Sequence, residues 1–491
     1  SGLGGVPLAD VLLVGNSAGA TDIDMSGNSV LAALRYECSG TTGQVRVGTN
    51  SGLTSQGSSA VAIGNSAGTT TQGGFSVAVG DRAGNSGQGI GSVAIGYISG
   101  NSNQGENAIA VGNSAGQTTQ GASAVAVGSF AGRTTQGNFS VAVGNSAGKT
   151  SQGQSSVAIG ISAGNSGQSS SAVAVGSNAG FSGQGSSAVA VGNLAGNLNQ
   201  AGSAVAVGDS AGNSGQSSSA VAVGSNAGFS GQGSSAVAVG NLAGNLNQAG
   251  SAVAVGDSAG NSGQSASAVA VGVSAGRTTQ GSHAVAIGNS AGRTTQGTSA
   301  VAVGVSAGQT TQGASAVAVG DSAGFDGQLA SAVAVGSGAG NSGQGESSVA
   351  IGSSAGQTTQ GNTAVAVGNL AGNSGQLANA VAVGVNAGRT TQGSSAVAIG
   401  RQAGQIMQGA DAVAVGSLAG QSNQFAGSIA LNASGVALNP AVAGLFINPI
   451  RAVTQTTALG YDAATKEVTY YTPVSGPDLT QDISVNSLTV G

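Results

Sequence analysis

Apolar and polar positions along the chain follow one phrase that recurs every sixteen residues. Residues 60–73 read AVAIGNSAGTTTQG, and aligning on the Val-Gly or Ile-Gly pair gives 24 copies, from Val47-Gly48 to Val415-Gly416, with no insertion or deletion. In one-letter code the unit is S-A-V-A-[VI]-G-x-x-A-G-x-x-x-Q-G-x, and residues 169–216 recur unchanged as 217–264. A fixed period is typical of solenoids, in which each unit packs only on its neighbours.

Three kinds of structure can be considered for a sixteen-residue repeat: a pair of helices, a disordered chain and a β-solenoid. A helical pair is excluded, because glycine costs about 1 kcal/mol in a helix and two glycines recur in every unit beside β-branched residues. Disorder is disfavoured, because disordered chains are poor in the apolar residues that the AVAV phrase supplies. We therefore predict an all-β fold, a parallel β-solenoid (β-roll) of 24 sixteen-residue coils, in which each AVAV phrase is a strand stacked on the next.

Both faces of the predicted strand are apolar. Successive side chains point to opposite faces, so Val61 and Ile63 share one face while Ala60 and Ala62 share the other. Such strands are typical of sheets that are covered on both sides, so one face must line the coil and the other needs a second cover. The residues assigned to the core strand or to an interface are Val61, Ile63, Val77 and Val79.

The need to cover the second apolar face leads us to predict self-association. At about 4.8 Å per coil the repeats form a rod of roughly 115 Å. An apolar stripe even about 8 Å wide along this rod approaches about 1,000 Å², beyond the few hundred Å² that monomers usually expose. We expect a parallel homotrimer around a threefold axis; the alternative is a monomer that tolerates a small Ala face at its surface.

Two residue types never vary in the repeat, and each has a structural interpretation. Turn glycines supply left-handed backbone angles, and the first of them are Gly64, Gly68, Gly80 and Gly84. Identical amides one coil apart can form a hydrogen-bonded ladder, and its first members are Gln56, Gln72, Gln88, Gln104, Gln120 and Gln136. A sugar-binding row of Gln is the functional alternative.

The chain outside the repeats divides into two further parts. Residues 1–44 do not fit the frame and are interpreted as an N-terminal cap or linker, residues 45–432 as the solenoid, and residues 433–491 as a C-terminal β-rich module, possible as a trimer clamp. An open solenoid end exposes a sheet edge, so a cap is expected.

Composition excludes several classes of protein. Charged residues are 5% and aromatic residues 3% of the 491, with a net charge of −5, which disfavours nucleic-acid binding. Gly is abundant at 92 residues but lacks a G-X-Y period, which excludes collagen. No stretch approaches the roughly 20 apolar residues of a membrane span, and no signal peptide is expected at the start. Cys38 is the only cysteine, so no intrachain disulfide can form.

The repeat resembles those of known fibre proteins. The phrase SSAVAIGNSAG (58–68) resembles the head repeat of YadA-like trimeric autotransporter adhesins, whose [NS]-[SA]-[VI]-A-[IV]-G units build left-handed parallel β-rolls in a homotrimer. It is also similar to repeats of phage tail fibres and giant-virus fibre proteins, which match the x-x-x-Q-G part better. Residues 445–472 are similar to the strand-rich segment that follows such repeats in giant-virus fibre proteins, and residues 482–491 resemble junction segments of phage tail fibres. The resemblance implies a left-handed trimeric roll and a virion-surface or tail fibre.

Candidate chemistry is sparse. His283 stands where neighbouring copies have Ser or Ala, and no nucleophile, base and orienter come together. A calcium ladder would need oxygen ligands in every coil, whereas acids follow the first Gly only at Asp81, Asp209, Asp257 and Asp321; Asp22 and Asp24 lack the rest of an EF-hand loop. The glycine-rich turn lacks the Lys of a P-loop. We expect no enzyme, metal or cofactor.

Three surface features remain as alternatives. Thr pairs such as Thr70-Thr71 and Thr134-Thr135 suggest an ice-binding array, although other copies break the row. A basic row at one repeat position is a weak candidate for anionic glycans and comprises Arg133, Lys149, Arg277, Arg293 and Arg389. Sequons occur at Asn138 and Asn432.

The sequence thus predicts a structural and adhesive fibre protein of a virion or cell surface, extracellular, with itself as partner and host glycans or proteins as further candidates. The alternatives are a purely structural filament subunit that assembles end to end and, less favoured, an ice-binding protein or a carbohydrate-active tail spike.

Overall fold

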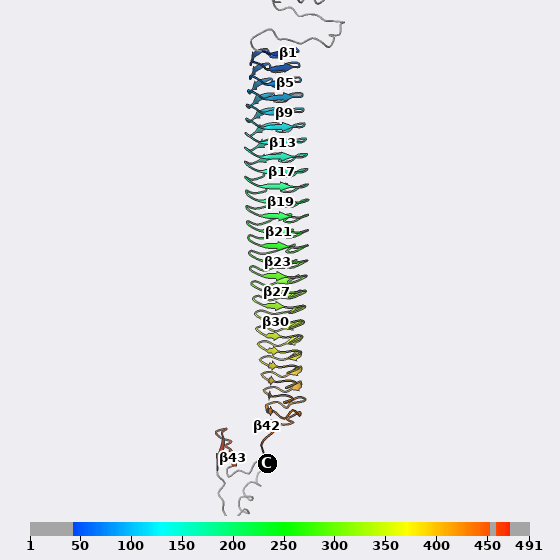
Figure 1. The fold of residues 1–491 in the computed structure, drawn as a ribbon. Helices are drawn as coiled ribbons and strands as arrows, with labels where there is room; N and C mark the ends of the chain where they lie inside the picture. Colours follow the sequence, from blue (N-terminus) through cyan, green and yellow to red (C-terminus); the bar gives the residue numbers. More distant parts are fainter. Residues whose placement is uncertain (1–42, 452–457, 472–491) are drawn as a thin grey trace, which may run out of the picture.

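The chain folds into a long rod of stacked coils, as the computed structural model shows (Figure 1). The structure describes residues 43–451 and 458–471. The predicted cap at 1–44 lies outside these ranges except for its last two residues, and so do Cys38, Asp22 and Asp24.

One strand from every coil joins the large sheet. These strands run from β1 (Val45–Val47) and β3 (Val61–Ile63) to β40 (Val413–Val415), each three residues long and sixteen residues after the one before. All pairs are parallel and in register, as Val61 with Val77. The described residues contain strands and no helix. The structure therefore confirms a parallel β-solenoid with sixteen-residue spacing.

The sheet extends beyond residue 432, where the sequence predicts that the solenoid ends. Strands β41 (Ser428–Asn432) and β42 (Gly444–Asn448) bring the sheet to 26 strands, and Ser428 pairs with Gly444 at the same sixteen-residue spacing. This coil lacks the glycine and glutamine frame, so the repeat pattern could not reveal it. The rest of the predicted C-terminal module contributes an antiparallel hairpin of β43 (Ala458–Tyr461) and β44 (Val468–Tyr471).

A second strand, which the sequence analysis missed, closes the opposite side in most coils. These strands end on the invariant Gln and form three groups: β2 (Thr54–Gln56) to β16 (Ser166–Gln168), β24 (Thr279–Gln280) to β28 (Thr311–Gln312), and β31 (Ser342–Gln344) to β39 (Ile406–Gln408). Single parallel bridges link the coils between the first two groups, as Ser182 with Leu198. The polar Thr and Ser in these segments carry no apolar periodicity, which is why the sequence did not indicate a strand here.

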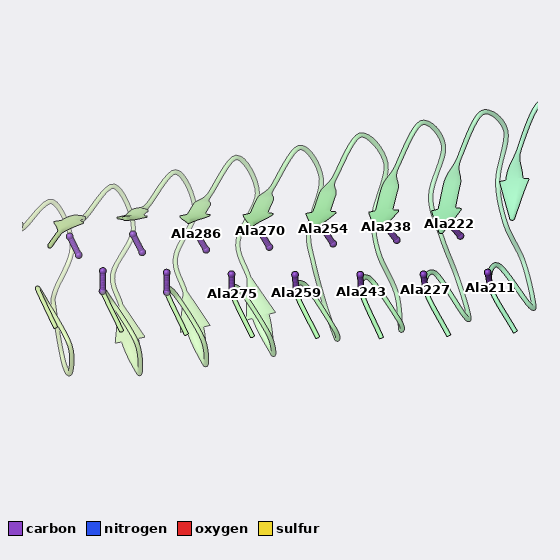
Figure 2. Close-up of a cluster of buried hydrophobic side chains, with 14 of the residues drawn as sticks. Ala211, Ala222, Ala227, Ala238, Ala243, Ala254, Ala259, Ala270, Ala275 and Ala286 are labelled. Atoms are coloured by element: carbon purple, nitrogen blue, oxygen red, sulfur yellow. The ribbon is translucent and has the colours of Figure 1, made fainter. Parts of the chain in front are cut away.

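Alanine fills the interior. Ala62 of the strand and Ala67 of the following turn are fully buried, and the same two positions are buried along the rod. Figure 2 shows the two rows, Ala222 to Ala286 and Ala211 to Ala275, pointing toward each other. The Val and Ile side chains of the same strands therefore face outward. Of the two faces that the sequence left open, the Ala face lines the coil.

Two glycines are required where the chain turns. Gly64 has φ of 125°, and a Cβ there would lie 2.5 Å from the carbonyl oxygen of Gly80 in the next coil. Gly68 has φ of 52°, and a Cβ would lie 2.5 Å from Oε1 of Gln72. A side chain at either position would clash as well as strain the backbone. The second glycine is thus invariant because it makes room for the glutamine.

Candidate functional surfaces

The outer face of the large sheet is an unbroken apolar stripe. In each of the 24 repeats both outward strand positions are Val or Ile, and β41 and β42 continue them with Ile429, Leu431, Leu445 and Ile447. These side chains are half-buried or exposed, for example 40% for Ile95 and 44% for Ile447. We call this face the aliphatic stripe; Val61, Ile63, Val77 and Val79 belong to it. No polar residue interrupts it in 26 strands, although water reaches every rung.

The stripe ends in a shallow groove. Val415, Leu431 and Ile447 lie on consecutive rungs, and they line the groove together with Pro449. Asn432 and Asn448 lie on its polar side, where Asn448 Nδ2 donates to Ser434 Oγ at 2.9 Å. The residues that line the groove include no titratable side chain, and its apolar side continues the stripe.

The invariant glutamines lie inside the coil. Their exposed fractions are 0–2%, apart from 8% for Gln56 at the first coil. In each coil from Gln56 to Gln424 the Nε2 atom donates to the carbonyl of the first stripe residue, as Gln216 to Val205 at 2.8 Å. Many also donate to Oε1 of the next coil, as Gln216 to Gln232 at 3.1 Å. A sugar cannot reach these amides, so the sugar-binding alternative is wrong.

The ladder is interrupted at particular coils, a feature that the sequence analysis did not find. Continuous amide bonds run from Gln168 to Gln344 and from Gln360 to Gln424; one further bond joins Gln104 to Gln120. Every bonded donor has Ala four residues later. Where Ser replaces this Ala, at Ser76, Ser92, Ser140, Ser156 and Ser348, the following bond is absent and the next Oε1 is buried without a partner.

In these coils the serine hydroxyl donates a hydrogen bond to the backbone carbonyl of the glycine three residues earlier. Ser140 Oγ donates to the Gly137 carbonyl at 2.6 Å, and Ser348 Oγ to that of Gly345 at 2.7 Å. Gln136 correspondingly lacks the bond to the carbonyl four residues on that Gln216 makes to Ala220 at 3.2 Å. Serine at this position thus marks a break in the ladder, but alanine does not guarantee the bond: Gln56 and Gln120 are followed by Ala60 and Ala124, yet the Oε1 atoms of Gln72 and Gln136 are also buried without a partner.

The face formed by the second strands is polar but discontinuous. Thr70 and Thr71 are exposed, yet Thr71 has φ of 51°. Leu198 and Leu246 stand in the Thr70 column and are each 40% exposed. A regular threonine array of the kind that would order water does not extend along this face, which disfavours the ice-binding alternative.

The basic row separates into neighbouring pairs. Arg133 and Lys149 lie on consecutive coils within 5.5 and 6.0 Å of the Phe130 ring, in cation–π geometry. Arg133 Nε also donates to Gln117 Oε1 at 2.9 Å. Arg277 and Arg293 likewise stand on consecutive coils, whereas Arg389 stands apart. Existing partners within the chain account for the placement of Arg133 and Lys149.

The remaining candidates are isolated from one another. His283 is exposed in a turn with φ of 59°. Asp81 and Asp209 each accept from an Asn one coil earlier, Asn65 and Asn193. Within residues 43–451 and 458–471, no three His, Cys, Asp or Glu side chains gather as a metal site would require, and no helix could span a membrane.

The two sequons differ in accessibility. Asn138 is exposed, and its Oδ1 accepts from the Ala122 amide at 2.9 Å. Asn432 is 4% exposed, and its Nδ2 donates to the carbonyls of Ser417 and Val436. Only Asn138 is open to modification on the folded rod.

The described residues contact the two ends of the interior in different ways. At the first coil Arg46 replaces the core alanine, pairing with Ala62, and its Nε donates to Gln56 Oε1. At the other end Leu438 packs against the alanine core, and its carbonyl accepts from Gly420 at 2.7 Å. Leu438 thus covers the alanine core at its C-terminal end, whereas Arg46 is itself exposed.

The fold and these surfaces define a parallel β-solenoid with one aliphatic stripe. Comparison with family models, curated proteins and solved structures found no match for the chain.

Proposed function

We propose that the chain is the subunit of a stiff fibre that self-associates along the aliphatic stripe as a parallel homotrimer. The observation that carries this proposal is the stripe itself, aliphatic on every rung and yet reached by water. A monomer would have no reason to exclude polar residues from 24 successive pairs of surface positions. An apolar surface of this length lowers the free energy when a second copy covers it.

Parallel alignment suits the rod because every coil has the same length. Copies that lie side by side in the same direction keep each rung of the aliphatic stripe level with the same rung of the neighbour from β1 to β42, since the register is sixteen residues throughout. Closing the arrangement around an axis brings every stripe inside. Three copies is the number that the resemblance to trimeric adhesin heads implies.

The polar faces then point outward in several copies. Many weak contacts to host glycans or proteins on such a fibre would add through avidity, which can exceed a single-site affinity by about 10²–10⁴. We place the fibre at a virion or cell surface, as a spacer with adhesive capacity. No catalytic step belongs to this function.

The contacts at the first and last coils favour separate rods over the alternative, a filament assembled end to end. A second rod stacking on β1 would have to displace Arg46 from Gln56, and one stacking beyond β42 would have to displace Leu438. Negative-stain imaging distinguishes the two functions: separate rods of uniform length are expected, and long polymers would favour the filament.

The test of the stripe is the mass of the particle in solution. Val207→Asp combined with Val223→Asp places two charges on the stripe; Ser218→Asp combined with Ser234→Asp places two on exposed positions of the same coils. By light scattering, the wild type and the Ser variant should have the mass of three chains and the Val variant that of one, with unchanged β circular dichroism. A monomeric wild type, or a Val variant with the mass of its control, would overturn the proposal.

A further inference from the structure

The β43–β44 hairpin presents one wholly apolar face. Leu459 pairs with Tyr470 and Tyr461 with Val468, so these four side chains share a face, which we call the hairpin face. Their exposed fractions are 78%, 78%, 63% and 60%, in the order Leu459, Tyr470, Tyr461 and Val468. No other strand of the described residues contacts the hairpin.

The back of the hairpin is different. It carries Ala458, Gly460, Thr469 and Tyr471. The Tyr471 ring lies over Gly460, where an added Cβ would be 3.2 Å from the ring. The back of the hairpin therefore covers part of itself with its own aromatic side chain, whereas no other strand of residues 43–451 lies over the hairpin face.

The turn is built to hold the hairpin in one shape. Asp462 Oδ1 accepts from the amides of Ala464 and Thr465, and the Asp462 carbonyl accepts from the Lys466 amide at 2.8 Å. The charges of the hairpin, on Asp462, Lys466 and Glu467, all lie in or beside this turn. Copies of the hairpin can thus approach through their uncharged strands without like charges meeting.

A two-stranded hairpin is marginal on its own and needs cover for its apolar face. The position of this hairpin in the chain indicates where the cover comes from. The last stripe residue is Ile447, and only six residues separate Arg451 from Ala458, a tether that reaches at most about 25 Å. Copies held together along the stripe would keep their hairpins within this reach, at high effective concentration.

We infer that the hairpin is a clasp between copies of this chain: the hairpin faces of associated copies pack against one another beyond the end of the stripe. This inference rests on the proposed function, because the stripe brings the copies together. The clasp opposes fraying of the fibre at its C-terminal end and favours the parallel alignment, since an antiparallel pair would place the hairpins at opposite ends.

Cysteine cross-linking of the full chain tests the clasp. In a Cys38→Ser background, Leu459→Cys places a thiol on the hairpin face, Thr469→Cys places one on the back, and Val207→Cys places one on the stripe. After treatment with a short bis-maleimide, Leu459→Cys should give at least tenfold more covalent dimer than Thr469→Cys. An equal yield of dimer from the two variants would overturn the clasp. The absence of any interchain product from Leu459→Cys would also overturn it, because the hairpin face would then be covered by another part of the same chain.

The stripe variant keeps the two proposals apart. If Val207→Cys cross-links but Leu459→Cys gives no more dimer than Thr469→Cys, association along the stripe stands and the clasp is wrong. Cross-linking of Leu459→Cys alone would keep the clasp and overturn association along the stripe. As a second measurement, Leu459→Lys with Tyr470→Lys should raise at least tenfold the concentration at which the particle dissociates, relative to Thr469→Lys; an unchanged value contradicts the clasp.

Discussion

At the scale of single residues, the buried glutamine joins three parts of the structure. Its Nε2 ties the second strand to the first through the Val carbonyl, and in bonded coils it also ties each coil to the next. The sequence predicts stacked amides from the invariance of Gln alone. It could not predict the bond to the Val carbonyl, because that bond depends on the path by which the two strands come to face each other.

Glutamines in complete and interrupted parts of the ladder should differ in their contribution to stability. Gln216 Nε2 donates to Val205, Ala220 and Gln232, and its Oε1 accepts from Gln200. Gln152 donates to Val141 alone, and its Oε1 has no partner. We expect Gln216→Ala to lower the local free energy of opening by about 3 kcal/mol, because buried partners lose their bonds, and Gln152→Ala to cost roughly 1–2 kcal/mol less.

Native-state hydrogen exchange on the flanking coils measures this difference directly, since coils in a solenoid open locally. Both substitutions remove the same volume from the same repeat position, so each serves as the control for the other. Equal effects on exchange would contradict a ladder that carries stability.

At the scale of elements, the hairpin turn depends on one carboxylate. Hydrogen bonds from the Ala464 and Thr465 amides lower the pKa of Asp462 below its usual value. Because the folded pKa is depressed, the stabilising contribution of Asp462 is present above the unfolded pKa and is lost as pH falls through the folded pKa. The turn should therefore be intact above about pH 4 and loosen below it.

Amide NMR shifts of Ala464 and Thr465 between pH 2 and 6 would follow this titration. The shifts should move with a midpoint below the ordinary Asp value, and Asp462→Asn, which keeps an acceptor oxygen but does not ionise in this range, should abolish the movement. A midpoint at or above the ordinary value would show that the two bonds are not maintained in solution.

At the scale of the whole molecule, length follows from the number of coils. Residues 217–264 repeat 169–216 exactly in sequence and comprise three coils in the same register. Deleting 217–264 should leave a folded rod that is shorter by about 14 Å, because each coil adds about 4.8 Å and contacts only its neighbours.

Removing 217–256 instead deletes two and a half coils and serves as the matched control. It would join Gln216, at the end of one coil, to Asp257, in the turn that follows the first strand of another coil. The coil at the junction then lacks its first strand, so the Ala and Gln positions no longer coincide and the rod should lose cooperativity there. Electron micrographs give the lengths, and thermal unfolding by circular dichroism gives the cooperativity. Equal stability of the two deletions would contradict a strict sixteen-residue register.

The sequence by itself determined the parallel solenoid, its period and the turn glycines, because an apolar phrase between invariant glycines allows few other folds. It could not decide which strand face points inward. Tertiary structure decided this, since two strands facing each other in so short a coil leave room for Ala62 and Ala67 but not for Val61.

The segment RTTQG adopts two backbone conformations in the same rod, and tertiary contacts select between them. At 133–137 its second threonine, Thr135, has φ of 51°, and at 389–393 Thr391 has φ of 53°. At 277–281 and 293–297 the same five residues keep Thr279 and Thr295 out of that region, and these two pair with each other in parallel strands. At 133–137 the pairs are instead made by Thr134 and Gln136, on either side of Thr135. A left-handed threonine is strained, so which residues pair, and whether the second threonine is strained, depends on the neighbouring coils. The five residues are identical in all four copies, so their own sequence cannot decide the conformation. The contacts with the coils stacked on either side decide it.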